Sequence, residues 1–215
     1  MDVASLPAVI TPALFFEKML IEWAEEIFTP PPLIEEVKFA IQIDLVGDEG
    51  GMWSLHFDLG DVECQTSPAM RPLLAFKGHS DAWMTTSGQW LKEFAQKIED
   101  AGGPEDFIEQ LIEKERQQGH PEIRLTDDIL QALLQHPTMF AFTLKDYEGQ
   151  DMHLLMGLWC TDFSKSPDIT VTLDGETLRA LRDQTLHPLS AWKQKKILVE
   201  GNLNLGLKLA KILRP

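Results

Sequence analysis

The sequence predicts an α+β protein made of two similar halves. Three observations favour this fold class. Apolar residues recur every three or four positions in some segments, as on one face of a helix, and at every second position in others, as on one face of a strand. The same order of elements, a helix, a hairpin, a third strand and a helix, occurs twice along the 215 residues. Identity between the halves is low, so the internal duplication is predicted from this order alone.

The first half is predicted to start with an amphipathic helix and to continue with a hairpin. Thr11 is the expected N-cap of that helix, Pro12 its first residue, and the prolines at 30–32 its end. The glycine-rich segment 47–51 is the expected turn of the hairpin, and Ser87 is the expected cap of a later helix. The predicted elements are a helix at 14–28, strands at 37–45, 52–59 and 82–84, and helices at 89–101 and 104–118.

The second half repeats this order, with Thr126 and Asp174 as the expected N-caps of its helices. The segment 187–192 is interpreted as a connector. The predicted elements are a helix at 127–135, strands at 139–144, 152–159 and 169–173, a helix at 176–183 and a strand at 195–201. We expect a first unit at residues 1–118, which lacks the C-terminal tail, and a more complete unit at 119–215.

The tail at 203–213 fits two periodicities. Every second residue from 203 to 209 is leucine, as in a strand, whereas a helix capped by Asn202 would place Leu205 and Leu209 on one face. The leucine-rich composition without β-branched residues favours a helix slightly, and the periodicity leaves both structures open.

The second half resembles the sterol carrier protein type 2 (SCP2) family. The matching features are the alternating strand at 169–173, the cap at Asp174, the connector from His187 to Trp192, and Gly201-Asn202 followed by the leucines of the tail. In the first half, 38–60 resembles the opening hairpin of the family, and 80–94 resembles its later strand and helix. The first half lacks the Gly-Asn-Leu tail, so it is interpreted as a pseudo-subunit.

The resemblance implies an SCP2-like α+β fold, with a curved, mostly antiparallel sheet of about five strands and helices on one face. It also implies an apolar cavity between the sheet and the helices, closed by the C-terminal helix, and it therefore favours a helical tail. Members of the family bind sterols, fatty acids, acyl-CoA thioesters or other lipids without a fixed catalytic residue.

Composition excludes several classes of protein. The hydrophobic content of 44% is too high for a disordered chain. A net charge of −15 argues against nucleic acid as a partner, because a polyanion requires clustered Lys and Arg. Two cysteines make neither a disulfide framework nor a zinc site. No apolar run approaches the ~20 residues that span a bilayer, and the N-terminus does not resemble a signal peptide, so a cytoplasmic location is expected.

The charge is spread unevenly. Residues 17–63 carry 12 acidic side chains and two lysines, whereas residues 193–215 carry six basic side chains and one acid. Two solvated faces of opposite sign explain this spread, and transient contact between the basic C-terminal segment and anionic head groups is the alternative.

No catalytic constellation is visible in the sequence. The six histidines are scattered without metal-ligand spacing, no Gly-x-Ser-x-Gly elbow occurs, and no phosphate-binding glycine motif occurs. We therefore expect neither an enzyme nor a metal site nor a cofactor.

The predicted function is non-enzymatic binding or transfer of a lipid, fatty acid, acyl-CoA or sterol-like ligand in a cavity between the sheet and the C-terminal helix. Alternation combined with the resemblance assigns the ligand-binding residues to two strands, a connector and the tail: Phe140, Phe142, Leu155, Trp192, Leu205 and Leu209. The alternative is a scaffold or dimerisation module with a filled cavity that docks to another protein. The sequence leaves a homodimer open.

Overall fold

The computed structural model describes residues 7, 9–22, 37–58, 61–103, 106–107, 109–110, 113, 126–183 and 185–213, with the backbone alone for 87–89. The later part of the helix predicted at 14–28 and most of the helix predicted at 104–118 lie outside these residues.

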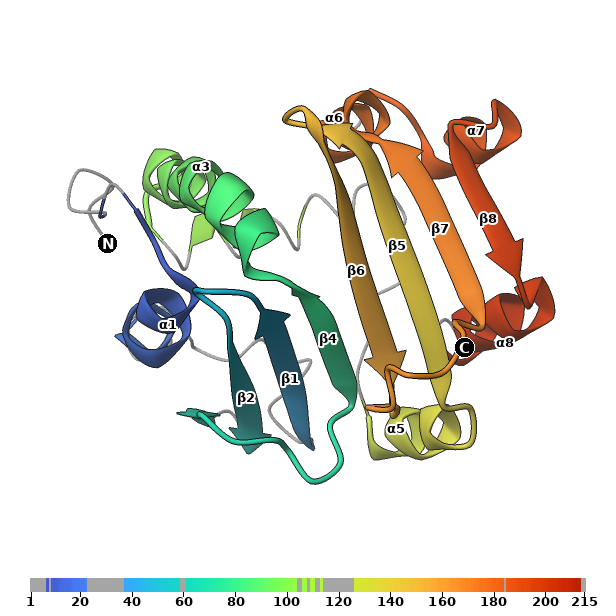
Figure 1. Ribbon diagram of the computed structural model, residues 1–215, viewed down its shortest axis with the longest axis horizontal. Helices are drawn as coiled ribbons and strands as arrows, with labels where there is room; N and C mark the ends of the chain where they lie inside the picture. The colour runs from blue at the N-terminus through green and yellow to red at the C-terminus, as the bar shows by residue number, and fades with distance from the viewer. Residues whose placement is uncertain are drawn as a thin grey trace.

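Eight strands form one continuous sheet in the order β3-β2-β1-β4-β6-β5-β7-β8 (Figure 1). The pairs β1–β4 and β5–β7 are parallel, and the other five neighbouring pairs are antiparallel. The expectation of a mostly antiparallel sheet is therefore confirmed. The strands are β1 (Lys38–Val46), β2 (Gly51–Asp58), β3 (Asp61–Gln65), β4 (Leu74–His79), β5 (Thr138–Tyr147), β6 (Gln150–Leu158), β7 (Ile169–Asp174) and β8 (Ile197–Gly201).

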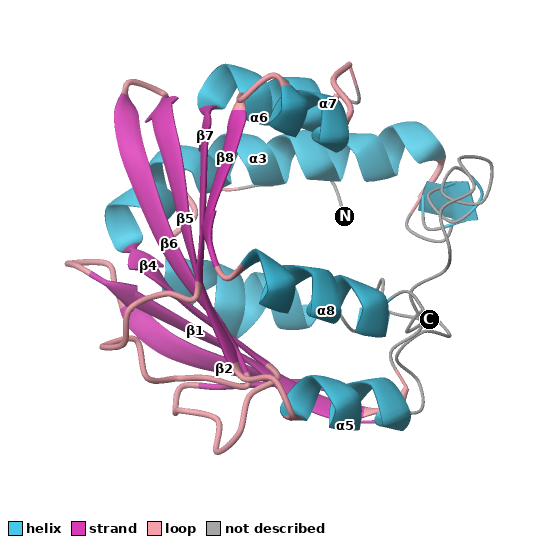
Figure 2. Cartoon of the chain, turned by 90° about the vertical axis from the view of Figure 1, so that its right-hand side faces the viewer, coloured by secondary structure: helices cyan, strands magenta, loops and turns pink. Residues whose placement is uncertain are grey.

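The helices labelled in Figure 2 lie on one side of this sheet. The helices pack on this side because the large apolar side chains of the strands point to it. In β5, for example, Phe140, Phe142 and Leu144 share this face, while Ala141 and Thr143 lie on the other. The helical segments are α1 (Pro12–Leu14), the π-helical turn η2 (Phe15–Met19), α3 (Ser80–Ala101), α5 (Asp127–Leu134), α6 (Gly175–Arg182), α7 (Pro188–Lys193) and α8 (Leu203–Leu213).

Side-chain caps begin α1, α5, α6 and α8 where the sequence predicts them. The backbone N–H of Leu14 donates to Thr11 Oγ1, and that of Thr177 donates to Asp174 Oδ1 at 2.6 Å. The tail is a helix, as the resemblance implies, and the backbone N–H of Leu205 donates to Asn202 Oδ1 at 3.1 Å. Each cap satisfies a backbone donor that would otherwise have no partner within its helix.

Three predicted elements are wrong. The segment 74–79 is strand β4 rather than loop, and α3 begins at Ser80, so residues 82–84 are helical and Ser87 lies inside the helix. His79 caps α3 instead, because its Nδ1 accepts from the backbone N–H of Asp81 at 3.3 Å. The connector at 187–192 contains α7, which His187 caps in the same way. The sequence prediction also missed the short strand β3.

The two halves have the same strand pairing. In each half an antiparallel hairpin is followed by a third strand parallel to its first strand, and a helix follows: β1, β2, β4 and α3, then β5, β6, β7 and α6. β4 and β6 pair at a seam of four residue pairs, from Leu74 with Leu158 to Lys77 with Leu155. The halves are thus joined in one sheet, and the duplication as an origin for them remains a prediction.

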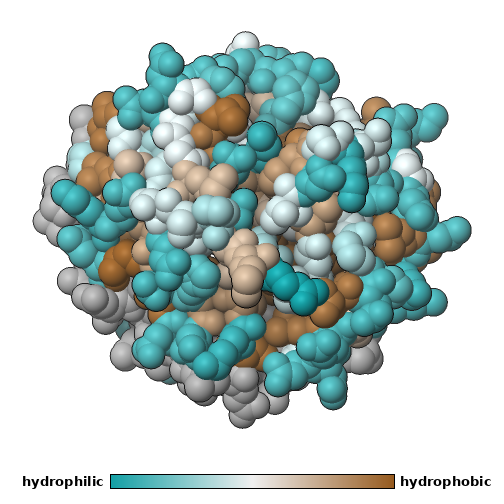
Figure 3. All heavy atoms as spheres, turned by 60° about the horizontal axis from the view of Figure 1, so that its bottom comes forward, coloured by the Kyte–Doolittle hydropathy of each residue, from teal (hydrophilic) through white to brown (hydrophobic). Residues whose placement is uncertain are grey.

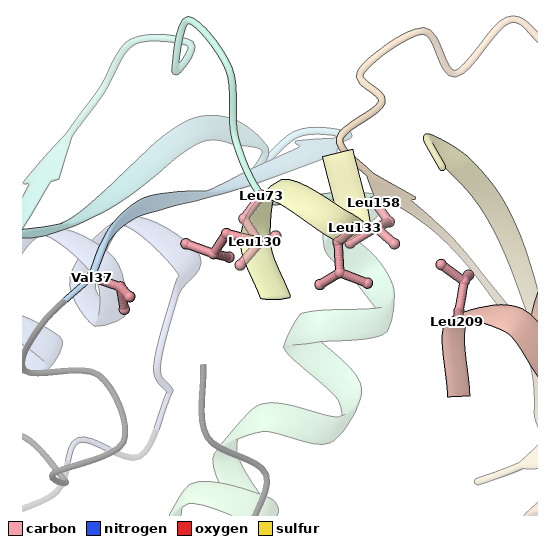
Figure 4. Packing of buried hydrophobic residues seen from close by; sticks show 6 residues of the cluster. All are labelled: Val37, Leu73, Leu130, Leu133, Leu158 and Leu209. Carbon is pink, nitrogen blue, oxygen red and sulfur yellow. The ribbon is translucent and has the colours of Figure 1, made fainter. Parts of the chain in front are cut away.

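The largest buried cluster lies under α5 and α8, at the end of the sheet shown in Figure 4. It contains Val37, Leu73, Leu130, Leu133, Leu158 and Leu209. Two smaller clusters hold the N-terminal segment against β1, β2 and α3, where the ring of Phe16 stacks on that of Trp53 at 5.1 Å. Trp90 and Trp192 lie outside these clusters and are half exposed.

Hydrophilic side chains cover much of the face seen in Figure 3, with apolar patches between them. Among the described residues, no helix combines the length and the apolar character needed to cross a bilayer.

Candidate functional site

An apolar pocket lies where the seam between the halves ends. β4 pairs with β6 only as far as Lys77. The next residue, Gly78, has no side chain, and after His79 the chain leaves the sheet as α3. A pocket of about 400 Å³, partly open to solvent, remains between α3, α6 and the helix-covered face of the sheet.

The second half supplies one wall of this pocket. Phe142 pairs with Leu154, and Leu144 pairs with Leu173, so these four side chains point to the same face of three adjacent strands. Leu178 of α6 completes the wall. The wall is apolar because Phe142, Leu144, Met152, Leu154 and Leu173 alternate along their strands with residues that point to the opposite face.

The first half supplies the other wall, through Leu45, Gly78, Ala82 and Trp83. The indole of Trp83 is held in place because its Nε1 donates to the backbone oxygen of Ile10 at 3.0 Å. Ala82 is the smallest side chain that α3 presents to the pocket, and it leaves space beside the indole.

Few polar residues line the pocket, namely His79, Thr86 and His153, and the side chain of His153 lies with that of Thr143 on the opposite face of the sheet. The two histidines have other partners, since His79 Nδ1 caps α3 and His153 Nδ1 lies 3.2 Å from Thr143 Oγ1. A concave, mostly apolar site of this volume with few polar groups is typical of small-molecule sites, whose volumes are roughly 300–1,000 Å³. The pocket can therefore accommodate an apolar group.

A second, polar pocket adjoins the apolar one and shares Thr86 with it. Its remaining lining residues come from α3, from α6 and from the turn between β5 and β6: Thr85, Trp90, Glu93, Tyr147, Glu148, Arg179 and Arg182. Arg182 Nη1 lies 3.1 Å from Glu93 Oε2, and Arg179 Nη1 lies 3.3 Å from Glu148 Oε1. The guanidinium of Arg179 also lies over the ring of Tyr147, 5.9 Å from its centre.

Two of the polar contacts cross from one half to the other. One is the ion pair between Arg182 of α6 and Glu93 of α3, and the other is the 3.0 Å hydrogen bond from Gln150 Nε2 to Thr85 Oγ1. We call these two contacts the latch. A hydrogen bond to Asp183 raises the pKa of Arg182 above its ordinary value, so the guanidinium is charged.

The structure distributes the six sequence-predicted residues over four places. Phe142 lines the apolar pocket. Phe140 is its neighbour on the same face, with ring centres 6.2 Å apart, and packs with Leu205 and Leu209 against the cluster under α8. These four residues therefore lie on the helix-covered side of the sheet, while the tail helix lies beside α5 rather than over the described pocket.

The other two residues lie elsewhere. Leu155 pairs with Ala141, so its side chain points to the opposite face from Phe142, and the residue of β6 that shares the face of Phe142 is Leu154. The assignment of this strand therefore differs from the structure by one residue, which reverses the face. Trp192 lies on α7 with 49% of its surface exposed.

Sequence reasoning missed the pocket residues of α3 and α6. Ala82 and Trp83 were assigned to a strand, and Leu178 was not singled out. A signal was present, since Leu74, Phe76 and Gly78 alternate with Ala75 and Lys77, which indicates a strand that ends before Ser80. In the described part of the chain, no group of three or more His, Cys, Asp or Glu side chains is placed to hold a metal ion.

The fold is therefore of the SCP2-like α+β class, with a mixed sheet covered by helices and an apolar pocket between them. The sequence comparison agrees: residues 108–214 match the model of the SCP-2 sterol transfer family, and the chain contains a domain of this family there. The matched segment comprises α5 to α8 and the second-half wall of the pocket, and it begins ahead of the boundary expected at residue 119.

Solved structures of such domains overlap part of the chain. Sterol carrier protein 2 from Yarrowia lipolytica is 17% identical, with 41% of this chain and 75% of that chain covered and a TM-score of 0.31. The sterol carrier protein domain 2 of Helicoverpa armigera is 22% identical (50% and 84% covered, TM-score 0.31). Sterol carrier protein 2 like 2 from Aedes aegypti is 25% identical (48% and 94% covered, TM-score 0.28). No curated protein matches the chain.

Proposed function

We propose that this protein is a non-enzymatic carrier that binds a lipid or another long apolar ligand in the pocket between its two halves. The observation that carries the proposal is the lining of that pocket, in which the residues from α3, α6 and five strands are mostly apolar. Burial of an alkyl chain there contributes about 0.8 kcal/mol per methylene group. The presence of an SCP-2 sterol transfer domain supports the same class of ligand.

The pocket requires both halves. Leu45, Ala82 and Trp83 lie outside the matched domain, whereas Phe142, Leu173 and Leu178 lie inside it. According to this proposal, the first half forms one wall of the binding site. The expectation that the tail helix closes a cavity over Leu205 and Leu209 remains a separate prediction.

The test is a titration of the full-length protein with a fluorescent fatty acid and, in parallel, a fluorescent sterol. We expect saturable binding of at least one probe, and native mass spectrometry should detect lipid that copurifies with the protein. In Ala82→Trp an indole occupies the pocket, and binding should be weakened at least tenfold. Ala210→Trp is the matched control, because Ala210 is exposed on α8 and the same change there should leave the affinity unaltered.

Two outcomes would decide against the carrier function. Absence of saturable binding together with absence of copurifying lipid would favour the alternative, a scaffold or docking module whose apolar space is filled by its own side chains. Equal weakening by both tryptophan substitutions would show that the ligand does not occupy this pocket. Sedimentation velocity on the same preparation would measure the homodimer that the sequence leaves open.

Transient contact with a membrane belongs to the same proposal. Leu189 and Trp192 of α7 are each about half exposed, and Lys193, Lys195 and Lys196 follow them directly. Apolar side chains flanked by lysines suit the surface of an anionic bilayer. The double variant Leu189→Ser/Trp192→Ser should cosediment less with vesicles containing phosphatidylserine, and neither protein should bind vesicles of phosphatidylcholine alone.

A further inference from the structure

We propose that Arg182, with Arg179 beside it, binds the anionic group of an amphipathic ligand whose alkyl chain lies in the apolar pocket, and that this anion takes the place of Glu93. The inference rests on the proposed carrier function and adds to it the residues that hold the anionic end of a long-chain carboxylate. It also gives the latch between the two halves a role as an internal competitor of the ligand.

The first step of the argument is continuity between the two pockets. Thr86 lines both of them. On α6, Leu178 lines the apolar pocket and Arg182 lines the polar one, and residues four apart lie on the same face of a helix. On β5, Leu144 lines the apolar pocket and Tyr147 lines the polar one. The two pockets therefore adjoin, and the polar one, with a volume of about 50 Å³, would receive only the head group of a molecule whose alkyl chain lies in the apolar one.

The second step is the chemistry of the polar end. Two guanidinium groups line that pocket, and a guanidinium binds a carboxylate through two parallel hydrogen bonds. In the structure the Arg182 fork is divided between two carboxylates, since Nη1 donates to Glu93 at 3.1 Å and Nε donates to Asp183 at 3.0 Å. Neither of these partners makes the bidentate contact on its own.

The third step is the exchange. The side chains of Arg182 and Glu93 are each 38% exposed, and ion pairs with this exposure contribute little to stability. Glu93 belongs to α3, whereas Asp183 is adjacent to Arg182 in the chain, so rotation of the Glu93 side chain breaks the first ion pair and leaves the second in place. A ligand carboxylate that replaces Glu93 leaves the charge around Arg182 unchanged, whereas a neutral head group leaves Arg182 with one partner fewer.

The experiment uses the full-length protein and two ligands with the same chain, dodecanoate and dodecanol, each competing with an uncharged apolar dye at pH 8. Arg182→Gln should weaken dodecanoate about tenfold, the usual effect of losing a charged hydrogen bond, and should change dodecanol less than about twofold. Glu93→Gln should tighten dodecanoate by up to about fivefold, because it removes the competing carboxylate. Arg71→Gln, an exposed loop position, is the control for a change in net charge and should change neither affinity.

The outcomes separate this inference from the carrier function. If the wild-type protein binds both ligands and Arg182→Gln weakens both equally, or neither, the head-group site is overturned while the carrier function stands. A Glu93→Gln variant that binds dodecanoate more weakly than the wild type would overturn the exchange. If neither ligand displaces the dye from the wild type, the carrier function fails, and the head-group site fails with it.

Discussion

Replacement of Leu209 by alanine tests how the C-terminal helix is held on the sheet. Leu209 is 5% exposed and is the residue of α8 that enters the main buried cluster, where it accompanies Leu130 and Leu133 of α5 (Figure 4). Deletion of a buried leucine side chain to alanine costs about 2–5 kcal/mol, because apolar contacts are lost and a cavity remains. Leu209 lies at the edge of α8 nearest the cluster, and we expect a loss near the middle of this range, about 3 kcal/mol.

Chemical denaturation followed by circular dichroism measures the change in the free energy of unfolding, and thermal denaturation measures the change in Tm. In a protein of about 200 residues each kcal/mol lowers Tm by roughly 2–4 °C, so Leu209→Ala should lower Tm by about 6–12 °C. Leu207→Ala is the matched control: Leu207 is 64% exposed on the same helix, and its loss should change the free energy of unfolding by less than about 0.5 kcal/mol. Equal effects of the two substitutions would refute the packing of α8 described above.

Three further predictions follow from local geometry. Gly201→Ala should destabilise the protein by more than about 2 kcal/mol, measured by urea denaturation, because φ is +98° and a Cβ would lie 2.2 Å from the backbone oxygen of Asp168. Asp174→Ala should cost about 1 kcal/mol at pH 7 through loss of the α6 cap. The hydrogen bond from the N–H of Thr177 lowers the pKa of Asp174, so its contribution is present above its unfolded pKa of about 3.9 and is lost as the pH falls through the native pKa. Burial raises the pKa of the Cys64 thiol, so its alkylation at pH 8, followed by mass spectrometry of the peptide, should be slower than that of glutathione.

Each of these has its own control. Gly149→Ala has a positive φ of +82° but no heavy atom within 4 Å of the new Cβ, so it should cost only about 1 kcal/mol of backbone strain. A stability difference between Asp174→Ala and the wild type that does not shrink below pH 4 would contradict the role of the ionised cap. Glu17 adds a negative charge near Cys64, so Glu17→Gln should speed the alkylation, and a slower reaction would contradict the assigned cause.

The sequence predicts the second half of the fold well because its signals are strong and local. Thr126, Asp174 and Asn202 are capping residues directly before apolar helical patterns, and 169–173 alternates without interruption. The helical structure of the tail was predicted only with the help of the resemblance, since its leucine pattern fits both a strand and a helix. In α8 these leucines surround much of the helix, and only Leu209 among them is buried.

The first half was harder to predict because its sequence carries local signals for the wrong elements as well as for the right ones. Gly78 weakens the strand pattern of β4, and Ser87-Gly88 resembles a helix start although it lies inside α3. The candidate site depends on these same residues. Its position could not be read from the sequence, because the pocket arises where β4 departs from β6, and strand pairing between distant segments leaves no local pattern. Phe142 was found by alternation combined with the resemblance, whereas Leu155 was assigned to the face that Leu154 occupies.

The seam has a consequence for how the chain can be divided. In the first half β3 pairs with the outer side of β2, whereas in the second half the equivalent side of β6 pairs with β4. In the second half β8 pairs with the outer side of β7, whereas in the first half the equivalent side of β4 pairs with β6. Cutting the chain between the halves would leave each fragment with a strand edge whose N–H and C=O groups have lost their partners. Such edges pair with other chains. A truncated second half, though it carries the family match, should therefore self-associate through β6, and the two halves can persist only as one molecule.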